Sequence, residues 1–271
     1  MSQSIPGVQH VIAVASGKGG VGKSTVAMNL AVALSVQGLK VGLMDADVYG
    51  PSVPRMMGIT DGSPQSDDGQ TITPALAHGV KCMSMGFLVD EDTPMIWRGP
   101  MVLSALKQML FQVKWAPLDV LVLDMPPGTG DTQLSIAQSV NLSGAVIVST
   151  PQDIALLDAR KGLNMFRKVN VPILGMVENM STYICPNCGH EEHIFSHGGA
   201  EKAAAELGVS FLGAIPLNLD IRTCTDEGKP MVTAAPDGPA AEIFRTIAQK
   251  VVDTLAANQA QAQQPVKIVI E

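Results

Sequence analysis

Short apolar runs alternate with helix-like stretches along most of the chain. The apolar runs contain few polar residues, which is typical of strands buried on both faces of a parallel sheet. The pattern predicts strands at His10–Ala15, Lys40–Met44, Val120–Leu123, Ala145–Ser149, Ile173–Val177 and Phe211–Ile215. It predicts helices at Ser24–Val36, Val102–Lys114, Thr132–Ser139, Ala155–Val169, Ala200–Leu207 and Pro239–Leu255. This order predicts an α/β fold, a doubly wound and mostly parallel sheet with helices on both faces.

Three segments depart from the alternation. Residues 60–79 are rich in Gly, Pro and Asp and indicate an excursion, interpreted as a hairpin with Val80–Met85 as a further strand. Residues 179–199 hold a cysteine pair and three histidines and are interpreted as an insert. Residues from 256 onward are rich in Ala and Gln. We therefore predict a single domain over residues 1–255 with an insert at 179–199, followed by a flexible tail at 256–271.

Composition excludes several classes of protein. Hydrophobic residues make up 46% of the 271 positions, which excludes a disordered chain. The 18 Lys and Arg against 25 Asp and Glu give a net charge of −7, which argues against a nucleic-acid partner. No charge-free stretch is apolar enough for a membrane span, and residues 1–7 lack the basic start and apolar run of a signal peptide. We expect a cytoplasmic protein that binds neither membrane nor nucleic acid.

Residues 17–24 match the phosphate-binding pattern G-x-x-x-x-G-K-[ST], between a predicted strand and a predicted helix. Lys23 is expected to reach the β- and γ-phosphates of ATP, and the Ser24 hydroxyl to bind Mg²⁺. Thr25, the next residue, is also expected to bind the nucleotide. The alternative is a Gly-rich turn without a ligand. The loop residues expected to turn their backbone toward phosphate oxygens are Gly17, Lys18, Gly19, Gly20, Val21 and Gly22.

Carboxylates follow two of the predicted strands. Asp45 and Asp47 come after Lys40–Met44, and Asp124 comes after Val120–Leu123. The carboxyl ends of parallel strands are where doubly wound sheets bind ligands, so Asp124 occupies a Walker B position that can hold Mg²⁺ or its water. The alternative for each carboxylate is a helix cap or a loop charge.

The segment after Asp124 reads Met-Pro-Pro-Gly-Thr-Gly-Asp over residues 125–131. Its prolines stiffen the backbone, while Gly128 permits close approach to a γ-phosphate. This combination indicates a nucleotide-sensing switch.

Cys185 and Cys188 have the C-x₂-C spacing that lets two thiolates face one metal ion. Two sulfurs do not complete a tetrahedral site, and three interpretations remain open. One is a zinc site completed by His190, His193 or His197. Another is an iron–sulfur cluster shared with the same pair on a second chain. The third is a dithiol redox centre.

The phosphate loop, with its additional Lys18, resembles the deviant Walker A loop of the MinD, ParA and NifH group of ATPases. The resemblance implies an ATP-sandwich homodimer in which Lys18 reaches the nucleotide of the partner. It also implies that Asp47 positions the attacking water, with Asp47 and Asp124 at the Mg²⁺ site, and that Gly128 contacts the γ-phosphate. By the same resemblance Asn179 contacts adenine, and Pro216 belongs to the nucleotide-binding set.

Five longer motifs lie at Ile5–Val8, Asp45–Ser52, Trp97–Met101, Asp124–Asp131 and Cys185–Gly189. With these motifs the chain resembles the Mrp (ApbC) family over nearly its whole length, up to about Leu255. That family implies a slow ATPase that carries a cluster between two subunits, of the 4Fe-4S type, with Cys185 and Cys188 of each subunit as ligands. Its partners would be a cluster assembly scaffold and apo iron–sulfur proteins, and zinc remains an alternative in the same site. The competing functions are a MinD- or ParA-like positioning ATPase and a zinc-stabilised nucleotide-binding adaptor.

Overall fold

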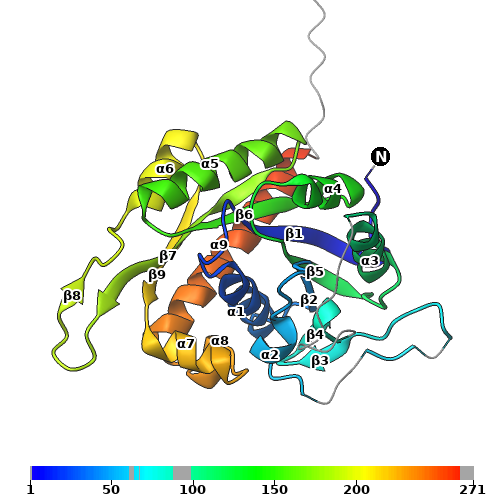
Figure 1. Ribbon diagram of the computed structural model, residues 1–271, viewed down its shortest axis with the longest axis horizontal. Helices are drawn as coiled ribbons and strands as arrows, with labels where there is room; N and C mark the ends of the chain where they lie inside the picture. The colour runs from blue at the N-terminus through cyan, green and yellow to red at the C-terminus, as the bar shows by residue number, and fades with distance from the viewer. Residues whose placement is uncertain (1, 61–63, 67, 88–98, 263–271) are drawn as a thin grey trace, which may run out of the picture.

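The computed structural model describes residues 2–60, 64–66, 68–87 and 99–262, and its strands form one nine-stranded, mostly parallel sheet in that part of the chain (Figure 1). The strand order is β3-β4-β2-β5-β1-β6-β7-β8, and β9 also pairs with β7. The strands are β1 (Val8–Ser16), β2 (Val41–Asp45), β3 (Ala75–Ala77), β4 (Val80–Ser84), β5 (Leu118–Asp124), β6 (Gly144–Ser149), β7 (Ile173–Ile184), β8 (Glu191–Glu192) and β9 (Phe211–Leu217). All six strands predicted from the apolar runs are present.

Helices cover both faces of the sheet, as predicted. One apolar core lies between the sheet and α1, α2 and α7–α9, and a second lies between the sheet and α3–α6. The helices are α1 (Lys23–Val36), α2 (Val53–Met56), α3 (Gly99–Phe111), α4 (Asp131–Ser139), α5 (Asp153–Lys168), α6 (Gly199–Leu207), α7 (Leu219–Asp226), α8 (Met231–Ala234) and α9 (Pro239–Ala262), with a 3₁₀ turn at Met85–Phe87. None of the helices in the described part of the chain is long and apolar enough to cross a bilayer.

Strand β1 is the point where the order of the sheet reverses. It pairs in parallel with β5 on one side and with β6 on the other. The loop that follows β1 therefore opens at the carboxyl edge of the sheet, in the crevice where doubly wound folds bind their ligands.

Several boundaries differ from the sequence prediction. Helix α9 continues to Ala262, so the expected tail is wrong for residues 256–262, while 263–271 lie outside the described residues. The hairpin in the excursion joins only β3 and β4 and turns at His78 and Gly79, both with positive φ. β4 confirms the further strand and pairs in parallel with β2. In the motif at Trp97–Met101, the first two residues, Trp97 and Arg98, lie outside the described residues.

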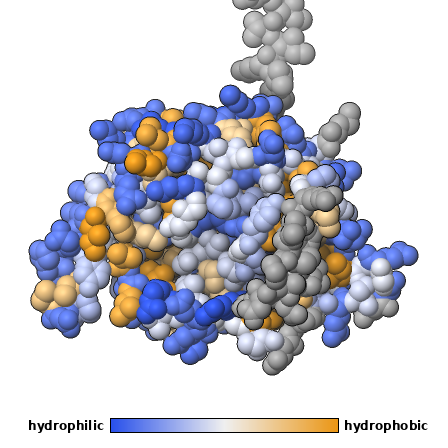
Figure 2. Space-filling model, viewed as in Figure 1, coloured by the Kyte–Doolittle hydropathy of each residue, from blue (hydrophilic) through white to orange (hydrophobic). Residues whose placement is uncertain are grey.

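The cysteine segment begins as part of the sheet. β7 runs to Ile184, beyond the predicted end at Val177, and its last two residues pair antiparallel with β8. The resulting hairpin projects from one side of the molecule in Figure 1, with the cysteine pair in its turn. Apolar residues reach the surface on the β7–β9 side (Figure 2), where Ile184, Ile194 and Leu219 are among the exposed large hydrophobic side chains.

Candidate functional site

The phosphate-binding loop joins β1 to α1 at the carboxyl edge of the sheet. Gly20 and Gly22 both have φ of +78°, a conformation that glycine adopts without steric cost. Gly22 precedes the first turn of α1, and no side chain caps this helix end. The uncapped N–H groups of the first turn, with the positive end of the helix dipole, are suited to bind phosphate oxygens.

Two glycines of the loop are required by their neighbours. A Cβ on Gly17 would lie 2.1 Å from the carbonyl carbon of Asp158 in α5. A Cβ on Gly22 would lie 2.1 Å from Asn179 Nδ2 in β7. That amide nitrogen donates a hydrogen bond of 2.8 Å to the backbone oxygen of Val21. Asn179, predicted as an adenine contact, is thus bonded to the phosphate loop, and its register partner Ile215 immediately precedes Pro216 in β9.

Lys23 and Asp124 form a buried ion pair at the centre of the site. Lys23 Nζ lies 2.5 Å from Asp124 Oδ1 and 3.2 Å from Ser24 Oγ. The two side chains are 6% and 0% exposed, so water does not screen their charges. Within the described residues, Asp124 Oδ2 is buried without a hydrogen-bond partner. Lys23 Nζ contacts both Asp124 Oδ1 and the Ser24 hydroxyl. A buried carboxylate oxygen such as Asp124 Oδ2 fits a hard cation such as Mg²⁺ or its bound water.

Asp45 organises the loop that follows β2. One carboxylate oxygen accepts the N–H of Asp47 at 3.0 Å, and the other accepts the N–H groups of Ser52 and Val53 at 2.8 and 3.1 Å and the Ser84 hydroxyl at 3.1 Å. Of the alternatives for this residue, a helix cap describes Asp45, because it accepts N–H groups at the start of α2. Burial, and then the negative charge of Asp124, raise the pKa of Asp45 to about 7.

Asp47 lies at the same edge, half-buried, within electrostatic reach of the ion pair. Burial raises the pKa of Asp47, the positive charge of Lys23 opposes that shift, and the negative charge of Asp124 adds to it. The structure therefore brings together Lys23, Asp47 and Asp124, three of the charged residues predicted from the loop motif and the strand ends. Parallel pairing of β2 with β5, which sets Asp45 opposite Asp124, accounts for this convergence.

The segment after Asp124 contacts the phosphate loop through its backbone. Gly128 has φ of +94°, and its N–H donates to the backbone oxygen of Ser16 at 3.2 Å. The buried Gln133 of α4 donates from Nε2 to the backbone oxygen of Pro126 at 2.5 Å. Sequence reasoning missed Gln133, because a polar residue in a short helix carries no signal of the turn it holds.

The cysteine pair sits in a tight, hydrogen-bonded turn. Cys185 N–H donates to the backbone oxygen of His190 at 2.9 Å, and Gly189 N–H donates to that of Cys185 at 2.8 Å. The N–H of Asn187, followed by the N–H and thiol of Cys188, donates to the Cys185 sulfur and lowers the pKa of its thiol. Cys188 is exposed and Cys185 half-buried. The turn therefore presents two sulfurs, one of them favoured as thiolate, at the surface.

The nearby histidines contact partners of their own. The rings of His193 and His197 stack with centroids 3.9 Å apart, and His190 Nε2 lies 3.3 Å from Glu192 Oε2. Nowhere in the described ranges do three or more His, Cys, Asp or Glu side chains gather in a group that could hold a metal ion.

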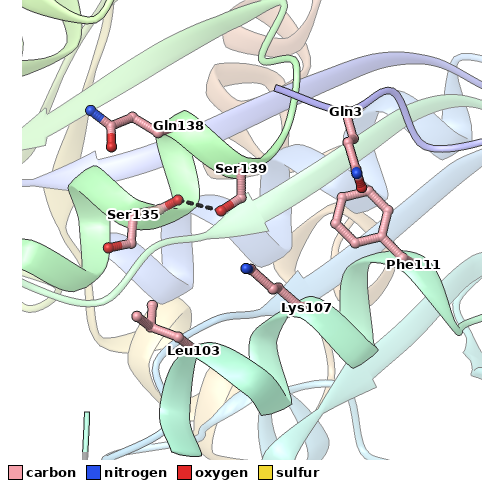
Figure 3. A pocket seen from close by; sticks show the side chains of 7 residues that line it. All are labelled: Gln3, Leu103, Lys107, Phe111, Ser135, Gln138 and Ser139. Carbon is pink, nitrogen blue, oxygen red and sulfur yellow. Dashed lines mark hydrogen bonds between the residues drawn. The ribbon is translucent and has the colours of Figure 1, made fainter. Parts of the chain in front are cut away.

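A separate hollow lies between α3 and α4 (Figure 3). Its volume is about 410 Å³, and Lys107 is the one cation among the side chains that line it. Ser139 Oγ donates to the backbone oxygen of Ser135 on its α4 side at 2.6 Å. None of the predicted nucleotide or sulfur residues lines this hollow. The lining residues are Gln3, Leu103, Lys107, Phe111, Ser135, Gln138 and Ser139.

One signal for a further residue was visible in the sequence. Glu178 is a charged residue at the end of an apolar run, directly before Asn179. In the structure it is 1% exposed, and its carboxylate accepts the N–H groups of Gly198 and Ala200 at 2.9 and 2.8 Å. Since buried carboxylates are uncommon without partners, its position pointed to such a contact, although not to the residues that make it.

The amino-acid sequence is similar to those of several characterised proteins. Residues 7–252 match a family model described as ParA: NUBPL iron-transfer P-loop NTPase. The chain is 57% identical over 248 residues to the iron-sulfur cluster carrier protein of Pseudomonas fragi, covering 90% of this chain and 86% of that protein. It is 55% identical over 256 residues to the iron-sulfur cluster transfer protein NUBPL of Mus musculus, covering 94% of this chain and 80% of that protein.

The fold is similar to those of solved nucleotide-binding proteins. A nucleotide-binding protein of Archaeoglobus fulgidus in complex with ADP superposes with a TM-score of 0.75 at 37% identity, covering 88% of this chain and 92% of that chain. The septum site-determining protein MinD of Pyrococcus horikoshii OT3, complexed with Mg-ADP, superposes with a TM-score of 0.67 at 26% identity, covering 92% and 97%.

Proposed function

Because the chain belongs to the NUBPL iron-transfer family of P-loop NTPases, we propose that it binds and hydrolyses ATP and carries an iron–sulfur cluster to apo-proteins. One observation carries the proposal. A single strand, β7, holds Asn179 against the phosphate loop and leads directly into the turn that contains Cys185 and Cys188. Nucleotide chemistry and sulfur chemistry therefore share one structural element.

The phosphate loop and the first turn of α1 bind the triphosphate through their N–H groups. Lys23 turns from the Asp124 carboxylate toward the β- and γ-phosphates, since the phosphate oxygens compete with that carboxylate for the ammonium group. Ser24, Asp47 and Asp124 would hold Mg²⁺, which neutralises part of the phosphate charge when bound. Asp47, whose pKa is raised by burial, orients the attacking water. Gly128 exchanges the hydrogen bond from its N–H to the Ser16 backbone oxygen for one to the γ-phosphate.

Two copies of the chain complete both sites. Each turn supplies two sulfurs, so two turns supply the four thiolates of a bridging 4Fe-4S cluster, which is the cargo. The lowered pKa of Cys185 favours the thiolate, the form that binds iron. Lys18, half-buried in the phosphate loop, reaches the nucleotide of the partner in the same homodimer. Hydrolysis is slow and coupled to loading from an assembly scaffold or to transfer, in the cytoplasm.

Anaerobic reconstitution with iron and sulfide tests whether the protein binds a cluster and whether Cys185 and Cys188 are its ligands. We expect iron and sulfide equivalent to about one cluster per two chains, on a dimer seen by native mass spectrometry. Cys185→Ala and Cys188→Ala lose the cluster, while Cys224→Ala, a matched change at a half-buried cysteine in α7, keeps it. Zinc without iron or sulfide would favour the adaptor alternative, and a cluster on monomers would contradict the bridging site.

A further inference from the structure

Both ends of the cysteine-bearing segment are attached next to the phosphate loop. At its entry, Asn179 donates to the backbone oxygen of Val21 at 2.8 Å. At its exit, Gly198 and Ala200 donate their N–H groups to Glu178, the residue directly before Asn179. Two consecutive side chains of β7 therefore make these contacts: Asn179 bonds to the phosphate loop, and Glu178 bonds to the exit of the segment.

Glu178 serves as the cap that α6 lacks in its own sequence. The helix begins after Gly198, which has φ of +70° and no side chain to accept the free N–H groups. Each carboxylate oxygen of Glu178 accepts one of them, and the side chain is 1% exposed. A buried carboxylate at a helix N-terminus makes charge-assisted hydrogen bonds, so this contact fixes the start of α6 relative to β7.

A second contact links the exit of the segment to the same loop through α5. A Cβ on Gly199 would lie 2.6 Å from both the backbone oxygen of Pro151 and Leu156 Cδ1. In the same helix, the backbone at Asp158 lies against Gly17 of the phosphate loop, where a Cβ would lie 2.1 Å from its carbonyl carbon. Helix α5 therefore packs without space to spare against both the loop and the start of α6, which lies beside it in Figure 1.

The turn with the sulfurs is held much less firmly than its two ends. β8 pairs with the end of β7 through Tyr183 with Glu192 and Ile184 with Glu191, and Tyr183 also pairs with Leu217 of β9. Close-packed interiors transmit small displacements. The turn is held to β8 by only two residue pairs, so it moves together with the two ends of the segment. A shift of the phosphate loop therefore reaches the turn through Asn179, Glu178 and α5.

We propose that Glu178 is a positioning residue that couples the nucleotide state of the phosphate loop to the accessibility of Cys185 and Cys188. This rests on the nucleotide binding of the proposed function and not on the cluster. By linkage, if ATP binding changes the affinity of the sulfurs for a metal ion, a bound metal ion changes nucleotide affinity by the same factor. The carboxylate acts through the start of α6 and has no contact with nucleotide or sulfur.

Alkylation of the cluster-free protein tests the coupling. The rates at Cys185 and Cys188 with iodoacetamide are measured by mass spectrometry, with and without saturating ATP and Mg²⁺, and Cys224 serves as internal reference. We expect ATP to change the rates at the pair by about fivefold or more in the unmodified protein. In Glu178→Gln this ratio falls to about one, while nucleotide affinity stays within about twofold, because only the cap is altered.

Glu201→Gln is the matched control. It removes an exposed carboxylate from the first turn of the same helix without touching the cap, so the ATP-dependent ratio stays as in the unmodified protein. Should Glu178→Gln fail to fold, hydrogen exchange at the Gly198 and Ala200 amides of the unmodified protein replaces it, with a change in protection expected on ATP binding.

Each outcome separates this coupling from the proposed function. A Glu178→Gln ratio equal to that of the unmodified protein, or amide protection that ATP leaves unchanged, overturns the coupling. ATP that binds without altering the alkylation rates of the unmodified protein also overturns it. By contrast, failure to assemble a cluster contradicts the proposed cargo and leaves this result standing.

Discussion

The phosphate loop and the cysteine turn differ in how much of each site one chain builds. Around the loop, Lys23, Asp45 and Asp124 are nearly inaccessible and are fixed by contacts from several strands. The turn holds an exposed Cys188 at the end of a two-residue ladder. The charged groups around the phosphate loop are therefore positioned within one chain, whereas the turn presents two sulfurs at the surface. In the proposed function, a second copy of the chain supplies the remaining sulfurs.

The pKa shifts of ionisable side chains also differ between the two regions. Burial raises the pKa of Asp45 to about 7, so its surroundings oppose charge. At the surface, the N–H of Asn187 and then that of Cys188 lower the pKa of Cys185, so its surroundings favour charge. In the proposed function, the lowered pKa of Cys185 favours the thiolate form that binds a metal ion.

The largest effect is expected from breaking the ion pair of the loop. Lys23→Ala removes the ammonium from the phosphates and leaves Asp124 buried and unpaired. We expect nucleotide affinity to fall by about 100-fold or more and the free energy of unfolding by about 3–5 kcal/mol. Calorimetric titration and denaturant unfolding measure the two quantities.

Two further variants separate these causes. Lys23→Ala combined with Asp124→Asn restores most of the stability but not the binding, because it removes the unpaired charge. Lys18→Ala, in the same loop, keeps both binding and stability and lowers turnover. Lys23→Ala with unchanged stability would contradict the importance of the buried pair.

Glycine-to-alanine changes compare the packing of the two regions. Gly17→Ala drives a Cβ into the α5 backbone, so we expect a loss of about 3 kcal/mol in the free energy of unfolding. Gly189→Ala, in the cysteine turn, has φ of +71° but open space around its Cβ, and costs about 1 kcal/mol of backbone strain. Denaturant unfolding measures both.

Gly19→Ala is the control within the loop, since its Cβ would meet only Pro127 Cβ at 3.8 Å. We expect a change below about 0.5 kcal/mol in the free energy of unfolding. Equal losses for Gly17→Ala and Gly19→Ala would show that the contact with α5 yields easily.

The smallest expected effect is the change in the free energy of unfolding when the pH is changed by one unit. A carboxyl group whose pKa is higher in the folded than in the unfolded protein binds its proton more tightly when folded. The contribution of Asp45 to stability therefore falls as pH rises from about 4 to about 7, by at most about 1.4 kcal/mol per pH unit.

Asp45→Asn lacks this titration, so its stability relative to the unmodified protein increases over that range. Urea unfolding of both proteins at several pH values measures the difference. A difference that stays constant with pH would contradict the raised pKa.

The sheet was predictable because its central strands are continuous apolar runs that must be buried. The end of β7 was not, because residues 178–184 mix polar and apolar types and are held by pairing with β8 and β9 and by the bond from Ser181 Oγ to the Ile215 backbone oxygen. Helix α9 was predicted too short, since Ala and Gln extend a helix by propensity without an apolar stripe.

The charged residues of the loop region were predictable from a local motif and from strand ends that parallel pairing brings together. The contacts of Asn179 with Val21 and of Glu178 with Ala200 join residues far apart in the sequence. Such contacts depend on which elements become neighbours, and no spacing rule in a single sequence supplies that.

The neighbouring attachment points of the cysteine segment have an evolutionary consequence. Because Glu178 and Asn179 hold its exit and its entry side by side, the segment leaves and rejoins the fold at almost the same place. Loops whose ends are already close tolerate insertion, deletion or replacement at small entropic cost. Descendants of such a protein are free to exchange the projecting loop for another while inheriting the phosphate loop and the sheet unchanged.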